Sequence, residues 1–262
     1  MNRIVQHPGG VIALTGAALF IFFVFIAGCK TDYSPTPPST SAINEDDIAD
    51  MIASSLSGSN SSNGLTAQID EATVIAGGGS LSKRSFGEHA LIPGYDTTIE
   101  RHDTVGTNSY DFTFQYSYSF QNAGDGLLFQ FAMSGFYATA FLSGADTAVG
   151  HLQLSGITST DTEYTLNGDY SRAGVIASKV RNHHTFSSRL EVSLINVKIL
   201  KTNGQIVSGT ASISISGKLP NDDFFSYSAT LVFTGSQSAT LTVNSKTYII
   251  NLATGVAIPP GS

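Results

Sequence analysis

Cysteine is nearly absent from this 262-residue chain, which contains one, and tryptophan is absent altogether. A single cysteine excludes a disulfide within the chain. Charged residues make up only 13% of the sequence, and this low fraction, together with many Ser, Thr and Gly, favours an extracytoplasmic β protein. Stability must therefore come from the hydrophobic core, to which 26 Phe and Tyr residues can contribute.

Recognisable catalytic and ligand-binding motifs are also lacking. The chain has no H-E-x-x-H, no G-x-S-x-G, no phosphate-binding glycine-rich loop and no Cys/His metal spacing. Most of its histidines stand next to a second polar residue, so in a strand the two would point to opposite faces and could not share a metal. These pairs are His183-His184, His102-Asp103 and Glu88-His89. We predict no catalytic residue, no metal and no cofactor. Asp161 and Glu163 share one strand face, which we interpret as solvated rather than as a cation site.

The charge of the chain is negative and unevenly distributed. Its formal net charge is −7, and seven acids against one base lie between Lys30 and Ala76. Such a chain repels nucleic acid and anionic lipid headgroups, so we discount both as partners. One stretch is basic and holds no acid; its members are Arg172, Lys179, Arg181, His183, His184 and Arg189. It could meet a phosphate or an acidic sugar, but we interpret it as a solvated loop and strand face.

The N-terminal segment has the order of a secretory signal. Arg3 precedes an apolar run from Val11 to Ala27, and the only cysteine follows two small residues. Ile26-Ala27-Gly28-Cys29 resembles the lipobox of bacterial lipoproteins. In that family the cysteine is joined to a diacylglycerol by a thioether, and the peptide is cut just before it. The alternative is an uncleaved transmembrane helix, for which the apolar run is only just long enough and lacks a charged flank.

This resemblance implies an organisation for the first part of the chain. Residues 1–28 would be the signal peptide, and residues 29–43 would be the acylated Cys29 with a Pro/Ser/Thr-rich tether. Two or three acyl chains hold a protein firmly to a membrane. Without Arg3 the mature chain has 12 basic and 20 acidic residues. In enterobacterial members an Asp directly after the cysteine marks inner-membrane retention, so Lys30 favours the outer membrane.

A short helical segment is predicted over residues 44–80. Asn44 has the side chain of an N-cap and is followed by three acids, which the helix dipole favours in a first turn. Apolar residues then recur at helical spacing in two stretches, 48–56 and 65–75, separated by small residues and followed by Gly77-Gly78-Gly79. Helices this short are not stable alone, so we expect them to lie against a larger element.

The sequence pattern of residues 95–254 predicts that this larger element is an antiparallel β domain. Six aromatic residues occupy every second position from Tyr110 to Phe120, with polar residues between them, which places all six on one face of a strand. The alternation recurs at 127–133, 164–170, 225–233, 239–243 and 248–252. Between Phe186 and Leu200 the apolar positions change parity, which indicates a bulge or a corner. We predict roughly ten strands in a meander, forming a curved sheet, a barrel or a sandwich.

These features predict a membrane-anchored envelope lipoprotein that is not an enzyme and acts as a binding or structural module. A carrier of an apolar ligand, such as a lipid, is the alternative, because helices before a long meander resemble in layout the lipoprotein-carrier fold, in which a curved sheet holds acyl chains under a helical lid. That interpretation requires an apolar cavity. A hydrolase of an envelope polymer is disfavoured because no catalytic constellation is present.

Overall fold

The computed structural model describes residues 43–58, 64–78, 97–105, 108–179 and 185–259, all of them within one compact unit that runs from Thr40 to Ser262. The predicted signal peptide, Cys29 and the tether up to residue 42 lie outside the described residues. The helices are α1 (Glu45–Leu56) and α2 (Leu65–Ala76), with one turn of 3₁₀ helix, η2 (Asn122–Gly124). The strands are β1 (Thr97–Val105), β2 (Asn108–Gln121), β3 (Gly126–Ala138), β4 (Leu142–Ser155), β5 (Glu163–Ser178), β6 (Thr185–Leu200), β7 (Ile206–Lys218), β8 (Phe224–Gly235), β9 (Ser238–Val243), β10 (Lys246–Asn251) and β11 (Val256–Ile258).

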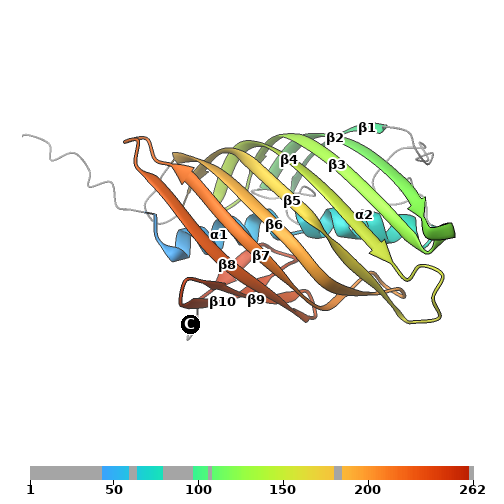
Figure 1. Cartoon of the computed structure of the whole chain (residues 1–262). Coiled ribbons are helices and arrows are strands. Elements are labelled where there is room, and N and C mark those ends of the chain that lie inside the picture. Colours follow the sequence, from blue (N-terminus) through green and yellow to red (C-terminus); the bar gives the residue numbers. More distant parts are fainter. Residues whose placement is uncertain (1–42, 59–63, 79–96, 106–107, 180–184, 260–262) are drawn as a thin grey trace, which may run out of the picture. The chain divides into compact units, whose positions relative to one another are not determined.

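The strands form one antiparallel meander, which confirms the predicted fold class. Each strand pairs with the next along the chain, from β1 to β11, and the first and last strands do not pair. The sheet is therefore curved and open, which decides between the predicted alternatives (Figure 1). It has eleven strands where the sequence predicted roughly ten, and β11 lies beyond the predicted end of the domain at residue 254.

Strand β2 shows why the sheet has one apolar face. Phe112, Phe114 and Tyr116 are buried at alternate positions, and the rings of Phe114 and Tyr116 stack with centroids 5.7 Å apart. Tyr116 stacks in turn on Phe129 of β3. Phe120 has the same parity but is exposed, because it lies at the end of the strand. The alternation along β2 thus determines which face of the sheet each side chain lies on. The distance of the residue from the strand end determines how deeply that side chain is buried.

Both predicted helices are present, and α1 has the N-cap that the sequence predicted. The Asn44 side chain accepts hydrogen bonds from the backbone N–H groups of Asp46 and Asp47, at 2.9 and 3.0 Å. The Asp47 carboxylate accepts in return from the backbone N–H of Asn44, which completes a capping box. Helix α2 ends at Ala76, one residue beyond the prediction.

The helices lie along the concave side of the curved sheet (Figure 1). The apolar face of α1 is buried there, and so is that of α2, in one hydrophobic core with the inner face of the strands. Polar contacts fix the positions of both helices: the Tyr227 hydroxyl donates to the Ile43 carbonyl at 2.7 Å, and Arg101 pairs with Glu71 at 2.8 Å. The helices therefore occupy the hollow that a sheet of this curvature would otherwise leave open.

The parity change in β6 is a β-bulge, as the sequence predicted. The register with β7 shifts between Ile195 and Lys198, and Asn196 adopts a left-handed φ of +51°. Ile195, the first apolar residue of the changed parity, is exposed, whereas Val197 is buried. The inward positions change parity at Asn196 because the bulge adds one residue there, so the side chains that follow point to the opposite face from the one that strict alternation would give them. Gly209 faces the bulge, and a Cβ there would lie 2.5 Å from the Cα of Val197.

Candidate functional site

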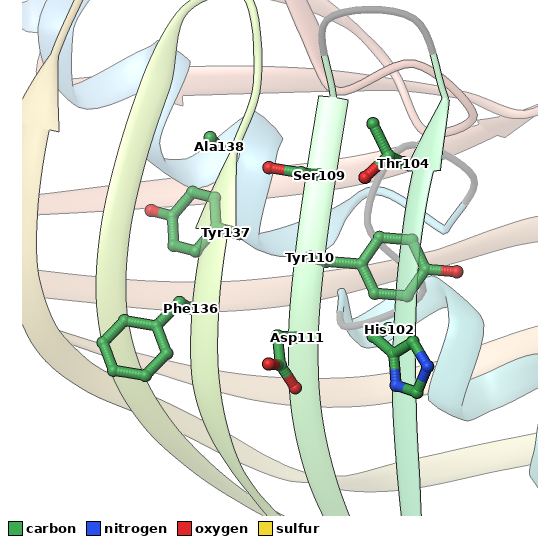
Figure 2. A pocket seen from close by; sticks show the side chains of 8 residues that line it. All are labelled: His102, Thr104, Ser109, Tyr110, Asp111, Phe136, Tyr137 and Ala138. Atoms are coloured by element: carbon green, nitrogen blue, oxygen red, sulfur yellow. The ribbon is translucent and has the colours of Figure 1, made fainter.

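A groove of about 680 Å³ lies on strands β1, β2 and β3 near one end of the sheet (Figure 2). It opens to solvent, and its size is that of a small-ligand site. Eight residues line it: His102, Thr104, Ser109, Tyr110, Asp111, Phe136, Tyr137 and Ala138. We take this groove as a candidate binding surface.

Hairpin register brings the groove residues together in two rows. His102 of β1 lies opposite Asp111 of β2, which lies opposite Phe136 of β3. The neighbouring row contains Thr104 and Ser109, which face each other across β1 and β2. Directly opposite residues project to the same side, so both rows point outward. Tyr110 and Tyr137, at the alternate positions, belong to the inner face, where Tyr137 is buried.

The groove combines hydrogen-bonding groups with an apolar surface. On the outward rows one imidazole, one carboxylate and the hydroxyls of Thr104 and Ser109 can donate or accept hydrogen bonds, and the Phe136 ring, 66% exposed, offers an apolar surface beside them. Ser109, His102 and Asp111 are residue types of a hydrolase triad. No side-chain hydrogen bond joins them among the described residues, and the histidine and aspartate are exposed, so the geometry gives no activated nucleophile.

The sequence did not reveal the pairing of His102 with Asp111. We considered His102 with its neighbour Asp103, which alternation sends to the other face. The residue that lies opposite His102 is Asp111 on the neighbouring strand β2, nine residues along the chain. The signal that could have found it is the closeness of the two strands in the sequence, since β1 ends at Val105 and β2 begins at Asn108, which limits the register of their pairing.

A buried ion pair is the second polar feature of the domain. Nε of Arg172, on β5, lies 2.6 Å from Oδ2 of Asp146, on β4, and the guanidinium carbon is 4.8 Å from the centre of the Tyr137 ring. Arg172 is only 4% exposed. Its Nη1 and the Oδ1 of Asp146 have no hydrogen-bond partner in the described part of the chain. Two strong polar groups are thus left unsatisfied in an apolar interior, which is costly.

The ion pair alters the protonation of its surroundings. Burial raises the pKa of Asp146, although the adjacent guanidinium acts in the opposite direction. Burial likewise raises the pKa of Tyr137 and of Tyr170 to about 12. The tyrosines therefore stay neutral over the physiological range, and their hydroxyl groups keep the proton that a hydrogen-bond donor needs.

Arg172 corrects the prediction for the basic stretch. We interpreted the stretch as solvated, and Lys179 and Arg189 are indeed exposed. Arg172 instead points into the core, because it follows Tyr170 at a spacing of two and shares its inward parity. Arg181, His183 and His184 lie outside the described residues.

The other residues singled out from the sequence lie apart from these two features. His151 is exposed on β4, opposite Asp169 of β5. Asp161 is exposed in the turn before β5, and Glu163 begins that strand. Among the described residues no group of three or more His, Cys, Asp or Glu side chains could hold a metal ion. No described helix has the length and apolar character needed to cross a membrane.

Comparisons with known proteins give no relative for this chain. No family model, no curated protein and no solved structure matches it.

Proposed function

We propose that this chain is a lipid-anchored protein of the bacterial cell envelope, attached through acyl chains on Cys29, that acts as a non-enzymatic binding or structural module. One observation supports the second half of this proposal: α1 and α2 lie along the concave side of the curved sheet (Figure 1), and their apolar side chains are buried in one core with its inner face. A protein whose interior is filled presents its outer surface to partners.

The packing of the helices supports a fixed role for them. In α1, Ile48, Ile52 and Leu56 have 1% exposure or less, and in α2 the same holds for Leu65 and Ala72. The first helix is also bound by its N-terminal acids, since the hydroxyl of Tyr248 donates to Asp46. A lid that opens belongs to the low-stability part of a structure, with few buried apolar contacts. Helices α1 and α2 instead bury many apolar side chains.

The outward groove on β1–β3 is the surface that we assign to binding. Its hydroxyls, imidazole and carboxylate, beside an exposed ring, suit a neutral ligand with hydroxyl groups and an apolar face better than an anion, because Asp111 would repel negative charge. The absence of an activated nucleophile in the groove favours binding without chemistry.

A carrier of an apolar ligand is the second candidate, and the buried pair of Arg172 and Asp146 favours it. Their unpartnered atoms, Nη1 and Oδ1, together with the neutral hydroxyl of Tyr170, could satisfy the polar head of a lipid whose chain lay along the aromatic inner face. Such a ligand would have to displace packed helix side chains, which is why we place the carrier second.

The N-terminal segment also supports a proposal for the membrane to which the protein is anchored. We propose the outer membrane rather than the inner one, because Lys30 follows Cys29 where an Asp would direct inner-membrane retention.

Metabolic labelling with palmitate tests the anchor. The native chain should take up the label and run as the processed form in a bacterial host, whereas Cys29→Ala should accumulate as an unlabelled precursor. Ser41→Ala, a change in the tether, is the matched control and should be labelled like the native chain. Labelling and processing of the Cys29→Ala chain would refute the anchor.

A further inference from the structure

A row of outward side chains, most of them apolar, crosses the outer face of the sheet. Six residues lie directly opposite one another on successive strands, from β3 to β8. They are Phe136, Ala145, Val175, Ser187, Lys218 and Phe224. Because residues that face each other project to the same side, the six side chains form one continuous outward row.

Four of the six side chains are apolar, and three of these four are the most exposed large hydrophobic side chains in the described part of the chain. Phe224 is 81% exposed, Phe136 is 66% exposed and Val175 is 52% exposed. A further exposed ring, Phe141, lies in the turn that follows β3. Single exposed hydrophobic residues need no explanation, but several that line up across neighbouring strands mark an interaction surface.

The row lies near the end of the sheet from which the chain leads toward Cys29. Alternate turns of a meander lie at alternate ends, so the turns β3–β4, β5–β6 and β7–β8 share one end. Ile43 lies at the same end, since its carbonyl accepts from the hydroxyl of Tyr227, three residues after Phe224 on β8. We refer to it as the Ile43 end; in Figure 1 it is where α1 begins and β7 meets β8.

The intervening chain limits how far this end can be from the membrane. Fourteen residue steps separate Cys29 from Ile43. Fully extended, they span at most about 50 Å. An acylated Cys29 would thus hold the Ile43 end within that distance of the bilayer and raise the effective concentration of lipid around the row.

We infer that the row from Phe136 to Phe224 docks on the surface of the bilayer that holds Cys29, so that the domain lies with its Ile43 end against lipid. This inference rests on the proposed anchor. Aromatic side chains are favoured at the interface between headgroups and acyl chains. A second weak apolar contact next to an anchor would orient the domain without needing affinity of its own.

The contact relies on apolar insertion rather than on charge. Lys218 is the one basic residue in the row, and its ammonium lies 2.8 Å from the carboxylate of Asp222. The pair leaves little net charge to attract anionic headgroups, in agreement with the acidic character of the whole chain. Docking should therefore change little with added salt.

Depth-dependent fluorescence tests the docking with the acylated full chain in vesicles of phosphatidylethanolamine and phosphatidylglycerol. Because acylation occupies Cys29, a fluorophore can be placed at a single new cysteine, Phe224→Cys or the control Val232→Cys. Val232 is exposed on the same face of the same strand, eight residues away, or about 26 Å. A quencher attached to lipid acyl chains should reduce emission several-fold at position 224 and by less than a fifth at position 232.

The outcomes separate the docking from the anchor. If the chain takes up no palmitate and does not float with vesicles, the anchor fails and the docking fails with it. If the chain floats but both positions are quenched alike, or position 224 stays fully open to aqueous iodide, the docking is wrong while the anchor stands. Protection of position 224 that rises with protein density and persists in detergent would assign the row to a second copy and would also overturn the docking.

Discussion

Phe114 illustrates how much of the stability of this domain depends on single aromatic residues. Its side chain has no exposed surface, and it lies between Phe112 and Tyr116 on the inner face of β2. The guanidinium of Arg101 lies 5.0 Å from the centre of its ring. Removing the ring would remove both its transfer free energy and the contacts of its neighbours.

We predict that Phe114→Ser lowers the free energy of unfolding by about 3–5 kcal/mol, since it creates a cavity and buries a hydroxyl. Ser117→Ala is the matched control on the other face of the same strand, where the hydroxyl makes only a long contact with Gln130, and it should change stability by less than about 0.5 kcal/mol. Urea unfolding of both variants measures the difference. Equal losses would contradict a sheet with one buried face.

Gly150 shows a residue whose identity is decided by a neighbouring strand. A Cβ at this position would lie 2.3 Å from ring atoms of Phe131, which therefore lies directly over the glycine. The two residues are opposite each other on β3 and β4. Glycine here makes room for an aromatic residue of the core rather than forming a turn.

At the scale of elements, the ion pair between β4 and β5 is the least expected feature. Both charges are almost fully buried, and each leaves one polar atom without a partner among the described residues. The cost of desolvating two charges in an apolar core is comparable to the attraction between them. The ion pair as a whole therefore contributes little to the free energy of unfolding. Removing either residue alone would nevertheless leave the other charge buried without a counter-charge.

Two variants separate these effects. Arg172→Met should cost about 3–5 kcal/mol, because it leaves the carboxylate of Asp146 buried without a counter-charge. The double variant Asp146→Leu, Arg172→Met should recover most of that loss, since both polar groups are then gone. Denaturant unfolding of the native chain and of both variants gives the comparison. A double variant less stable than the single one would mean that the pair itself stabilises the sheet.

At the scale of the whole molecule, the sheet and the helices form one core rather than a container with a cover. The inner faces of the strands and the apolar faces of α1 and α2 share a single cluster of buried residues. Contacts from both helices reach strands near opposite edges of the sheet, Glu71 to β1 and Asp46 to β10. Opening the helices would break these contacts together.

Hydrogen exchange should show that cooperativity. We predict that amides in the centres of α1 and α2 exchange as slowly as those in β5 and β6, because they open only with the whole domain. The acylated chain, purified in detergent, should carry no additional lipid in native mass spectrometry beyond its own acyl chains. Fast exchange confined to the helices, with a saturable fatty acid that is lost in Arg172→Met, would instead establish the carrier.

The elements with strong periodic patterns were predictable from the sequence. The six alternating aromatics placed β2, and the spacing of apolar residues from Ile48 to Leu56 placed α1. Strands β1, β4, β7 and β11 were not placed. On β4 the middle inward positions, from Gly144 to Gly150, hold two glycines, an aspartate and an alanine, so the buried leucines at 142, 152 and 154 do not form a continuous alternation, and β1 is a polar edge strand. Their pairing comes from the strands beside them.

The sequence by itself determined the class of the fold, the capped helices, the lack of an internal disulfide and the lipobox-like segment, because each depends on residues close together in the chain. Tertiary structure alone decided that the sheet stays open, that the helices fill it and that Arg172 is buried. It also brought His102 to Asp111, and Phe136 into one row with Phe224. These relations depend on hairpin register and on sheet curvature. Both result from the packing of all the strands together, so no local pattern encodes them.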